Sequence, residues 1–310
     1  MENDQLIDDP KVKTLDRAIR TAFILLVLVV IGFGAYYYLD RYAYSSTPLV
    51  DRNVEKQEAA ALDDPQNFNT RMQLANAYAM RGLVDQAIEQ YQAALVLRPS
   101  STDAMLGEAM LYAGKNDDAA LPLLEKVIAV RKEGEFAAVD TRLATAYYLL
   151  ASIQYRRQQY DLAVENALAS SNISKTDADT RLVLANSYRA LGKNDEAIEQ
   201  YNEAILFVPE FTEAYQGLEA CYRDAGRDKE ARWAGAMAEL SSGKYSEAAA
   251  RLEQLANEAP GMKEVRWGLG MAYARLKEDE KAAAAFRAAL AIDPDYQPAK
   301  DGLARLKISQ

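Results

Sequence analysis

The sequence repeats itself with a period of about 34 residues. A six-residue motif that begins at a turn-forming residue and ends in alanine recurs along the chain. Its last residues are Ala87, Ala119, Ala163, Ala197, Ala231, Ala248 and Ala282. Half of the intervals between neighbours equal this period, and the interval from Ala231 to Ala248 is half of it. Two pairs of prolines keep the same spacing. Such a period is typical of a chain that stacks one supersecondary unit many times.

Each repeat contains two amphipathic helical stretches. Apolar residues recur at helical spacing in both halves, as in Leu74, Ala75 and Tyr78, followed by Ala87, Tyr91 and Ala94. A turn residue separates the two stretches, and proline ends the second one. The pattern predicts an all-α chain in which helix pairs stack over residues 63–308, in about six to seven units.

Three stretches carry nearly complete sets of residues at fixed offsets. They are Leu74, Ala75, Tyr78, Gly82, Ala87, Tyr91, Ala94 and Pro99; Leu184, Ala185, Tyr188, Gly192, Ala197, Tyr201, Ala204 and Pro209; and Leu269, Gly270, Tyr273, Ala282, Phe286, Ala289 and Pro294. In this pattern the chain resembles the tetratricopeptide repeat (TPR) family, and more narrowly the single-span, membrane-anchored bacterial members. The resemblance implies an α-solenoid with a right-handed superhelix and a role in protein binding.

The repeat also departs from regularity at four places. The half period implies that one helix near residues 227–241 serves two units. About ten extra residues near 129–143 must lengthen a helix or a loop. Glu219 falls in a column of small residues and needs a partner or solvent. Residues 297–307 read as a polar capping helix, which solenoids require.

Residues 21–39 form an uncharged apolar run. As a helix, its 19 residues would extend roughly 28 Å, about one hydrocarbon thickness. Tyrosines gather at its C-terminal end, as in an aromatic belt. We predict a transmembrane helix over 21–39, after a disordered N-terminal tail over 1–20 and before a juxtamembrane linker over 40–62. A cleaved signal peptide and a buried soluble helix are the alternatives, and the length and the missing polar face disfavour them.

The charges beside this run give its expected orientation. Four basic residues precede it (Lys11, Lys13, Arg17 and Arg20), and three follow it (Arg41, Arg52 and Lys56). Basic residues tend to stay in the cytoplasm. We therefore expect a single-pass protein of the cell (inner) membrane, with a cytoplasmic N-terminus and an extracytoplasmic repeat domain.

The composition removes several classes of function. A net charge of −10 argues against nucleic acid as a partner. The chain has no histidine and one cysteine, Cys221, which excludes histidine-based catalysis and an intrachain disulfide. No nucleotide-binding, nucleophile or metal-ligand motif is found. We expect no catalytic residue, no cofactor, no metal and no small-molecule substrate, and therefore not an enzyme.

The resemblance also implies which residues bind a partner. In the family, the second, fifth, ninth and twelfth residues of each first helix usually line a concave groove. Here they include Met72, Asn76, Tyr148, Ser152, Tyr155, Asn186, Arg189, Gln216, Arg223, Trp267 and Met271. Asn76 and Asn186 share one column, and an amide can both donate to and accept from a peptide backbone. The alternative is that the aromatic members belong to the core between helices.

The sequence therefore favours a membrane-tethered adaptor that binds a protein or peptide in the groove. By analogy with the family, it would act in envelope protein secretion, maturation or complex assembly. The repeats carry most of the negative charge, which favours a partner with a basic segment. The main alternative is a structural subunit of a larger membrane complex. A cytosol-facing import receptor and an enzyme are further alternatives.

Overall fold

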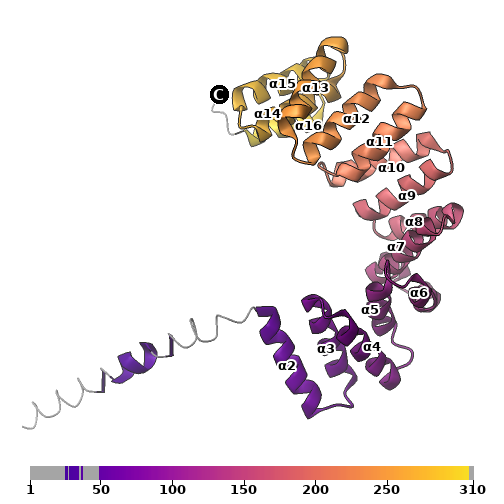
Figure 1. Cartoon of the computed structure of the whole chain (residues 1–310), viewed down its shortest axis with the longest axis vertical. Helices are drawn as coiled ribbons and strands as arrows, with labels where there is room; N and C mark the ends of the chain where they lie inside the picture. Colours follow the sequence, from indigo (N-terminus) through magenta and orange to yellow (C-terminus); the bar gives the residue numbers. More distant parts are fainter. Residues whose placement is uncertain (1–24, 27, 35, 38–48, 307–310) are drawn as a thin grey trace, which may run out of the picture. The chain divides into compact units, whose positions relative to one another are not determined.

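The computed structural model describes residues 25, 26, 28–34, 36, 37 and 49–306. All regular elements in these residues are helices, as the sequence predicts, and the chain divides into two compact units, Met1–Leu97 and Arg98–Gln310 (Figure 1). The first unit contains α2 (Leu49–Asp63), α3 (Phe68–Arg81) and α4 (Val84–Leu97). The second contains α5 (Thr102–Tyr112), α6 (Asp117–Arg131), η2 (Ala137–Val139), α7 (Thr141–Arg156), α8 (Tyr160–Ile173), α9 (Ala178–Ala190), α10 (Asn194–Phe207), α11 (Thr212–Asp224), α12 (Asp228–Ser241), α13 (Tyr245–Glu258), α14 (Lys263–Arg275), α15 (Asp279–Ile292) and α16 (Gln297–Arg305).

The expected membrane span over 21–39 falls partly outside these residues. Its described part, residues 25, 26, 28–34, 36 and 37, is helical, and its apolar side chains are exposed. Among the described residues, no helix combines the length and the hydropathy that crossing a bilayer requires. The tail over 1–20 lies outside the described residues. The membrane span therefore stays a prediction.

Helix α2 occupies most of the segment that was expected to be a linker. Residues 49–63 form a helix because Val54 and Ala61, two helical turns apart, are buried against α3. The Tyr78 hydroxyl donates a hydrogen bond of 2.7 Å to Glu58, and Arg81 forms an ion pair with Asp51. No copy of the motif precedes α2, so the periodic pattern contained no sign of it. Helical packing in the first unit therefore begins well before residue 63.

The turns between paired helices depend on left-handed backbone. Five glycines at these turns have positive φ, namely Gly82, Gly114, Gly192, Gly226 and Gly243. Gln158 and Lys277 take the equivalent place in two repeats, with φ of 60° and 61°. Glycine reaches this region without steric cost, which is why it recurs in the motif.

The extra residues between the second and third repeats form a loop rather than extra helix. Helix α6 ends at Arg131 and α7 begins at Thr141, with the short helix η2 between them. Arg131 forms ion pairs with Asp140, at 2.8 Å, and with Asp103. The loop is therefore attached to the helices on both sides of it.

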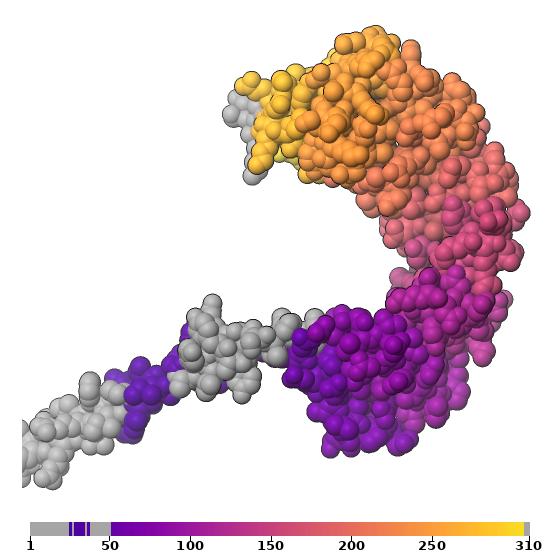
Figure 2. Space-filling view, viewed as in Figure 1, coloured from indigo at the N-terminus to yellow at the C-terminus, as the bar shows by residue number. Residues whose placement is uncertain are grey.

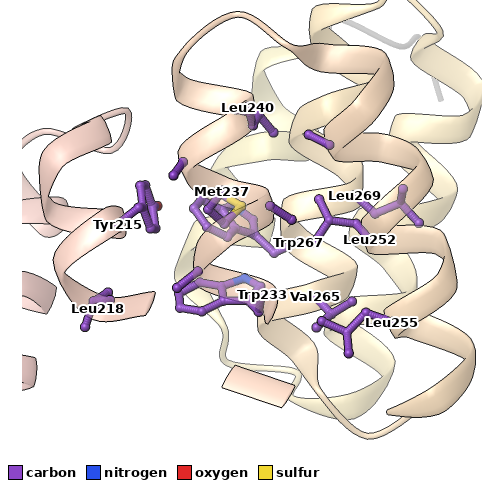
Figure 3. Packing of buried hydrophobic residues seen from close by; sticks show 14 of the residues in the cluster. Tyr215, Leu218, Trp233, Met237, Leu240, Leu252, Leu255, Val265, Trp267 and Leu269 are labelled. Carbon is purple, nitrogen blue, oxygen red and sulfur yellow. The ribbon is translucent and has the colours of Figure 1, made fainter. Parts of the chain in front are cut away.

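Helix α12 belongs to two helix pairs. It packs against α11 as the second helix of one pair and against α13 as the first helix of the next. It also contacts α14, just as the first helices α7 and α9 contact each other. Figure 3 shows Trp233 and Met237 of α12 between Tyr215 of α11 and Leu252 of α13. Residues 233–238 are all buried, so α12 has no continuous polar face.

The side chain of Glu219 on α11 packs against Gly235 on α12. A Cβ at Gly235 would lie 3.0 Å from the Glu219 Cδ, so the carboxylate occupies the space of a side chain on α12. Glu219 also forms an ion pair with Arg223, one turn later on α11. The charged residue in the column of small residues therefore has a partner.

Aromatic residues of second helices pack on glycines of the following first helix. A Cβ at Gly217 would overlap the ring of Tyr201, and one at Gly302 would lie 2.6 Å from the Phe286 ring. The separation in sequence is the same in both pairs, so the contact recurs with the repeat. Tyr201 is fully buried and cannot move aside, so these glycines allow neighbouring pairs to approach closely.

We predict that Gly217→Ala lowers the free energy of unfolding by about 1–3 kcal/mol, because overpacking against Tyr201 outweighs the helix propensity of alanine. Denaturant unfolding followed by tryptophan fluorescence measures this, since both tryptophans lie in the second unit. Gly261→Ala is the control, because a Cβ there would meet no atom within 4 Å. Its stability should change by less than about 0.5 kcal/mol. Equal stability of the two variants would contradict the packing described.

Candidate protein-binding grooves

The second unit presents its first helices on two different faces. Among its early pairs, α5 contacts α7, α7 contacts α9, and α9 contacts α11. Beyond the shared helix, α12 contacts α14 and α14 contacts α16. We call the first set the odd face and the second set, together with α10, the even face. Because α12 has both roles, the face formed by first helices changes from odd to even at this helix. Figure 2 shows the colours of the second unit in sequence order, as expected where each helix packs against the next one in the chain.

Seven of the predicted groove residues lie on the odd face. They are Tyr148, Ser152 and Tyr155 on α7, Asn186 and Arg189 on α9, and Gln216 and Arg223 on α11. Arg189, Gln216 and Arg223 are exposed, and the other four are partly buried. Met72 and Asn76 belong to the first unit, where Met72 is partly buried and Asn76 is exposed.

A polar cluster surrounds the hydroxyl of Tyr201. This hydroxyl donates a hydrogen bond of 2.6 Å to the Asn186 Oδ1, and the Arg189 guanidinium also hydrogen-bonds it. Burial raises the pKa of Tyr201. The structure thus brings together two predicted residues of α9, Asn186 and Arg189.

The asparagine column has a structural role that the sequence did not reveal. The Asn76 Oδ1 accepts a hydrogen bond of 2.6 Å from Tyr91, which matches the bond between Tyr201 and Asn186. In both repeats the tyrosine follows the asparagine at the same interval. The amide oxygen therefore already accepts one hydrogen bond within the repeat, which orients the amide.

Tyr148, Ser152 and Tyr155 also make contacts within their own repeat. The Ser152 hydroxyl donates to the Tyr148 carbonyl at 2.9 Å. The ring of Tyr155 lies 5.7 Å from that of Tyr160 on α8. These contacts fit partly buried residues of the helix interface better than free ligands.

Arg223 lies at a cavity of about 600 Å³ between α11, α12 and α13. Two further arginines line it, Arg232 and Arg251. Each arginine has a carboxylate partner: Arg223 pairs with Glu219, Arg232 with Glu258, and Arg251 with Glu239. The hydrogen bond from Arg232 holds the pKa of Glu258 at about 2. The cavity is therefore lined by ion pairs that already satisfy these charges.

Cys221 is buried within the second unit. Burial raises the pKa of its thiol to about 11. The thiolate is the reactive form of cysteine, so the thiol packs as an apolar side chain at neutral pH.

The even face contains an aromatic groove, a cavity of about 360 Å³. Its aromatic and apolar lining comprises Tyr215, Trp233, Trp267, Met271 and Tyr296, with Ile205, Leu206, Pro209 and Pro298 from the neighbouring segments. The rings of Tyr215 and Trp233 meet edge to face at 5.9 Å, and those of Trp267 and Tyr296 at 6.5 Å. Two predicted residues, Trp267 and Met271, therefore line this groove. Met271 is partly buried, and Trp267 is 8% exposed and also belongs to the hydrophobic core between helices, which is the alternative position that the sequence left open for the aromatic residues.

Helix α10 supplies the exposed edge of the aromatic groove. Leu206 is 72% exposed and lines the cavity. Phe207 and Val208 follow it and are also exposed. A second cavity of about 470 Å³ adjoins the groove and shares Met271, Gly302 and Arg305 with it. The apolar surface thus continues beyond the cavity in two directions.

The two tryptophans and two tyrosines of the groove have four N–H or O–H donors, and two of these already donate hydrogen bonds. The Trp233 Nε1 donates to the Glu264 carbonyl at 3.1 Å, and the Tyr215 hydroxyl donates to the Pro209 carbonyl at 3.2 Å. Within the described residues, the Trp267 Nε1–H and the Tyr296 hydroxyl have no side-chain hydrogen bond, and neither atom is sealed from solvent. The groove therefore offers two donors to a ligand.

Sequence reasoning missed Trp233, Tyr215 and Tyr296. The sequence did contain a signal for Trp233. Trp233, Trp267 and Asp301 are separated by one repeat period each, so they occupy equivalent positions in three successive repeats. This equivalence can be recognised only when α12 is treated as the first helix of its repeat. Tyr215 and Tyr296 lie outside the columns that the family uses for binding, so their position follows from the packing alone.

No three cysteine, aspartate or glutamate side chains in the described part of the chain gather where a metal ion could bind. The grooves are lined by rings, aliphatic groups and ion pairs. The groups present suit recognition of a protein surface or a peptide.

Stacked antiparallel helix pairs with lined grooves define a helical repeat protein. Tetratricopeptide repeat models match residues 57–104, 72–134 and 233–296, and a TPR repeat model matches residues 185–218. The chain belongs to the tetratricopeptide repeat family. The first of these matches begins within α2.

Several solved structures resemble this chain. MamA is 24% identical, and the match covers 56% of this chain and 97% of MamA, with a TM-score of 0.49. YrrB, described as a TPR protein with an unusual peptide-binding site, is 18% identical, with coverage of 80% and 97% and a TM-score of 0.44. A tetratricopeptide repeat protein from Parabacteroides merdae is 18% identical, with coverage of 87% and 97% and a TM-score of 0.47. None of the curated proteins matches the sequence.

We predict that Asn186 and Tyr201 are coupled in stability. A double-mutant cycle with Asn186→Ala and Tyr201→Phe should give a coupling free energy of about 1 kcal/mol, because either change removes the same partly buried hydrogen bond. Denaturant unfolding of the four variants measures it. Gln216→Ala is a control, since Gln216 is exposed on the same face. A coupling free energy near zero would show that the amide oxygen is not used within the repeat.

Proposed function

We propose that the protein is a membrane-tethered adaptor without enzymatic activity, which binds a protein or peptide partner in the aromatic groove of the even face. One observation carries the proposal: both tryptophans of the chain line the same cavity, each with 8% of its surface exposed. Tryptophan and tyrosine are the residues that most often dominate binding energy at protein interfaces. On the odd face, by contrast, the Asn186 Oδ1 and the Arg223 guanidinium already have partners within the repeats.

The size and edges of the groove support a peptide partner. A cavity of about 360 Å³ is large enough to hold a few side chains. Exposed apolar residues at the end of α10 continue the surface beyond it. Isolated exposed apolar residues are common, but a run next to an aromatic cavity is typical of an interaction site.

The tether rests on the sequence. The uncharged run over 21–39 has the length of a membrane span, and the four basic residues before it favour a cytoplasmic N-terminus. In this arrangement the repeats lie outside the cytoplasm and act near the membrane surface, in secretion, maturation or assembly of other proteins. The high local concentration near the membrane would assist weak binding.

We predict that Leu206→Glu reduces partner binding at least about tenfold, since it places a charge at the apolar edge of the groove. Leu206 is exposed, so the fold should not change. A photo-crosslinking residue at position 206, used in native membranes, would identify the partner, and the purified pair then gives the binding constant by titration calorimetry.

Val130→Glu is the matched control, because Val130 is an exposed apolar residue at the end of α6. It should bind the partner like the wild-type chain. Equal binding by Leu206→Glu and Val130→Glu would exclude the aromatic groove as the site. A stoichiometric assembly in native mass measurements would instead favour the role of a structural subunit.

We also predict that the full chain stays in the membrane fraction after carbonate extraction at high pH, because an apolar span of this length is not released by loss of charge contacts. A variant with two arginines in the run, Val29→Arg and Ile31→Arg, should be released. Protease added to spheroplasts should digest the repeats. Their protection there, with digestion in inverted vesicles, would reverse the proposed topology.

A further inference from the structure

We propose that the aromatic groove binds a proline-rich segment in the polyproline II conformation, flanked by basic residues. The inference rests on the proposed function, because it names the class of partner for that groove.

The unused donors favour a partner with free carbonyl groups. Trp267 is 8% exposed and Tyr296 is partly buried, and among the described residues the Trp267 Nε1–H and the Tyr296 hydroxyl have no hydrogen-bond acceptor. The corresponding groups of Trp233 and Tyr215 donate to backbone carbonyls. A polyproline II segment has no internal hydrogen bonds, so its carbonyls are available. An α-helix has already used its carbonyls within the helix. A helical partner could meet these donors only through acceptor side chains or the carbonyls of its last turn, whereas every residue of a polyproline II segment offers a carbonyl.

The apolar lining suits proline rings. The edge-to-face pairs Trp233–Tyr215 and Trp267–Tyr296 form the floor of the groove, where Tyr215 is fully buried and each tryptophan is 8% exposed. Proline-rich segments bind in aromatic-lined grooves in several unrelated domains, and they lose little entropy because the conformation is preformed. Proline also lacks an N–H group, so the segment brings no donor that the apolar centre would have to satisfy.

The charges favour basic flanking residues. Glu264, Asp301 and Arg305 are the charged residues of the lining, which gives an excess of one negative charge. The nearby cations are paired, Lys263 with Asp293 at 2.6 Å and Arg275 with Glu210. Burial raises the pKa of Tyr296, and Glu264 and Asp293 raise it further. The negative potential around the groove therefore complements arginine or lysine in the ligand.

The two tryptophans make the test specific to this site. The chain has only these two, and both line the groove, so intrinsic tryptophan fluorescence reports on binding there. The probe is a synthetic peptide of about nine prolines with arginine at each end, which extends roughly 30 Å at about 3.1 Å per residue. The full-length chain is titrated with it. Two control peptides replace the prolines with alanines or the arginines with glutamates.

We expect a saturable change in emission with the arginine–proline peptide. The glutamate peptide should bind at least about fivefold more weakly, and the alanine peptide should cause no saturable change. Tyr296→Phe and Trp267→Phe should each weaken binding about three- to tenfold, because each removes one donor and keeps an aromatic ring. Tyr155→Phe, on the odd face, should bind like the wild-type chain. Circular dichroism verifies that each variant is folded.

Equal binding of the alanine and proline peptides would overturn the assignment to the polyproline II class, as would unchanged binding by both phenylalanine variants. So would the absence of any response to the arginine–proline peptide. These outcomes can be told apart from failure of the proposed function. If the natural partner still depends on Leu206 while the proline peptide does not bind, the groove is the binding site and only the class of ligand is wrong.

Discussion

The fold of the second unit depends on the burial of helix α12 from both sides. Residues 233–238 are consecutive and buried, which covers more than one and a half helical turns. An ordinary second helix of a repeat keeps a polar stripe toward solvent. Because α12 has none along this stretch, it must be covered by α11 on one side and by α13 and α14 on the other. The half period in the sequence is the mark of this double role.

The aromatic groove follows from that arrangement. In a regular array, first helices and second helices line opposite faces, and α10 would not share a cavity with α14 and α16. The change at α12 places the end of α10 beside Trp267 and Tyr296, so that residues from four even-numbered helices line one cavity. Where α11 packs against α12, the Glu219 carboxylate occupies the space that a side chain at Gly235 would fill. The double role of α12 thus accounts for the half period and for the groove.

The repeat pattern predicted much of this fold because it is periodic. Helical spacing and turn residues locate the pairs, and the glycines of the turns have the left-handed backbone that their position requires. Helix α2 could not be found in this way, because its stabilising contacts are particular side chains, such as Val54 and the pair Glu58 and Tyr78. The binding site was predicted only in part. Trp267 and Met271 lie in the groove, but the family columns assume one continuous face. Asn186 and Arg189 follow those columns, yet the structure shows them around the Tyr201 hydroxyl.

The most direct test of the account is the proximity of α10 and α16 in solution. Leu206 and Asp301 are both exposed and line the same cavity. In a chain with Cys221→Ala, the pair Leu206→Cys and Asp301→Cys should be joined by a short bifunctional thiol reagent within one molecule. The pair Arg223→Cys and Asp301→Cys should not be joined, because Arg223 lines the cavity on the other face. Cross-linking of the second pair without the first would show that the first-helix face does not change at α12, and the aromatic groove as described would not exist.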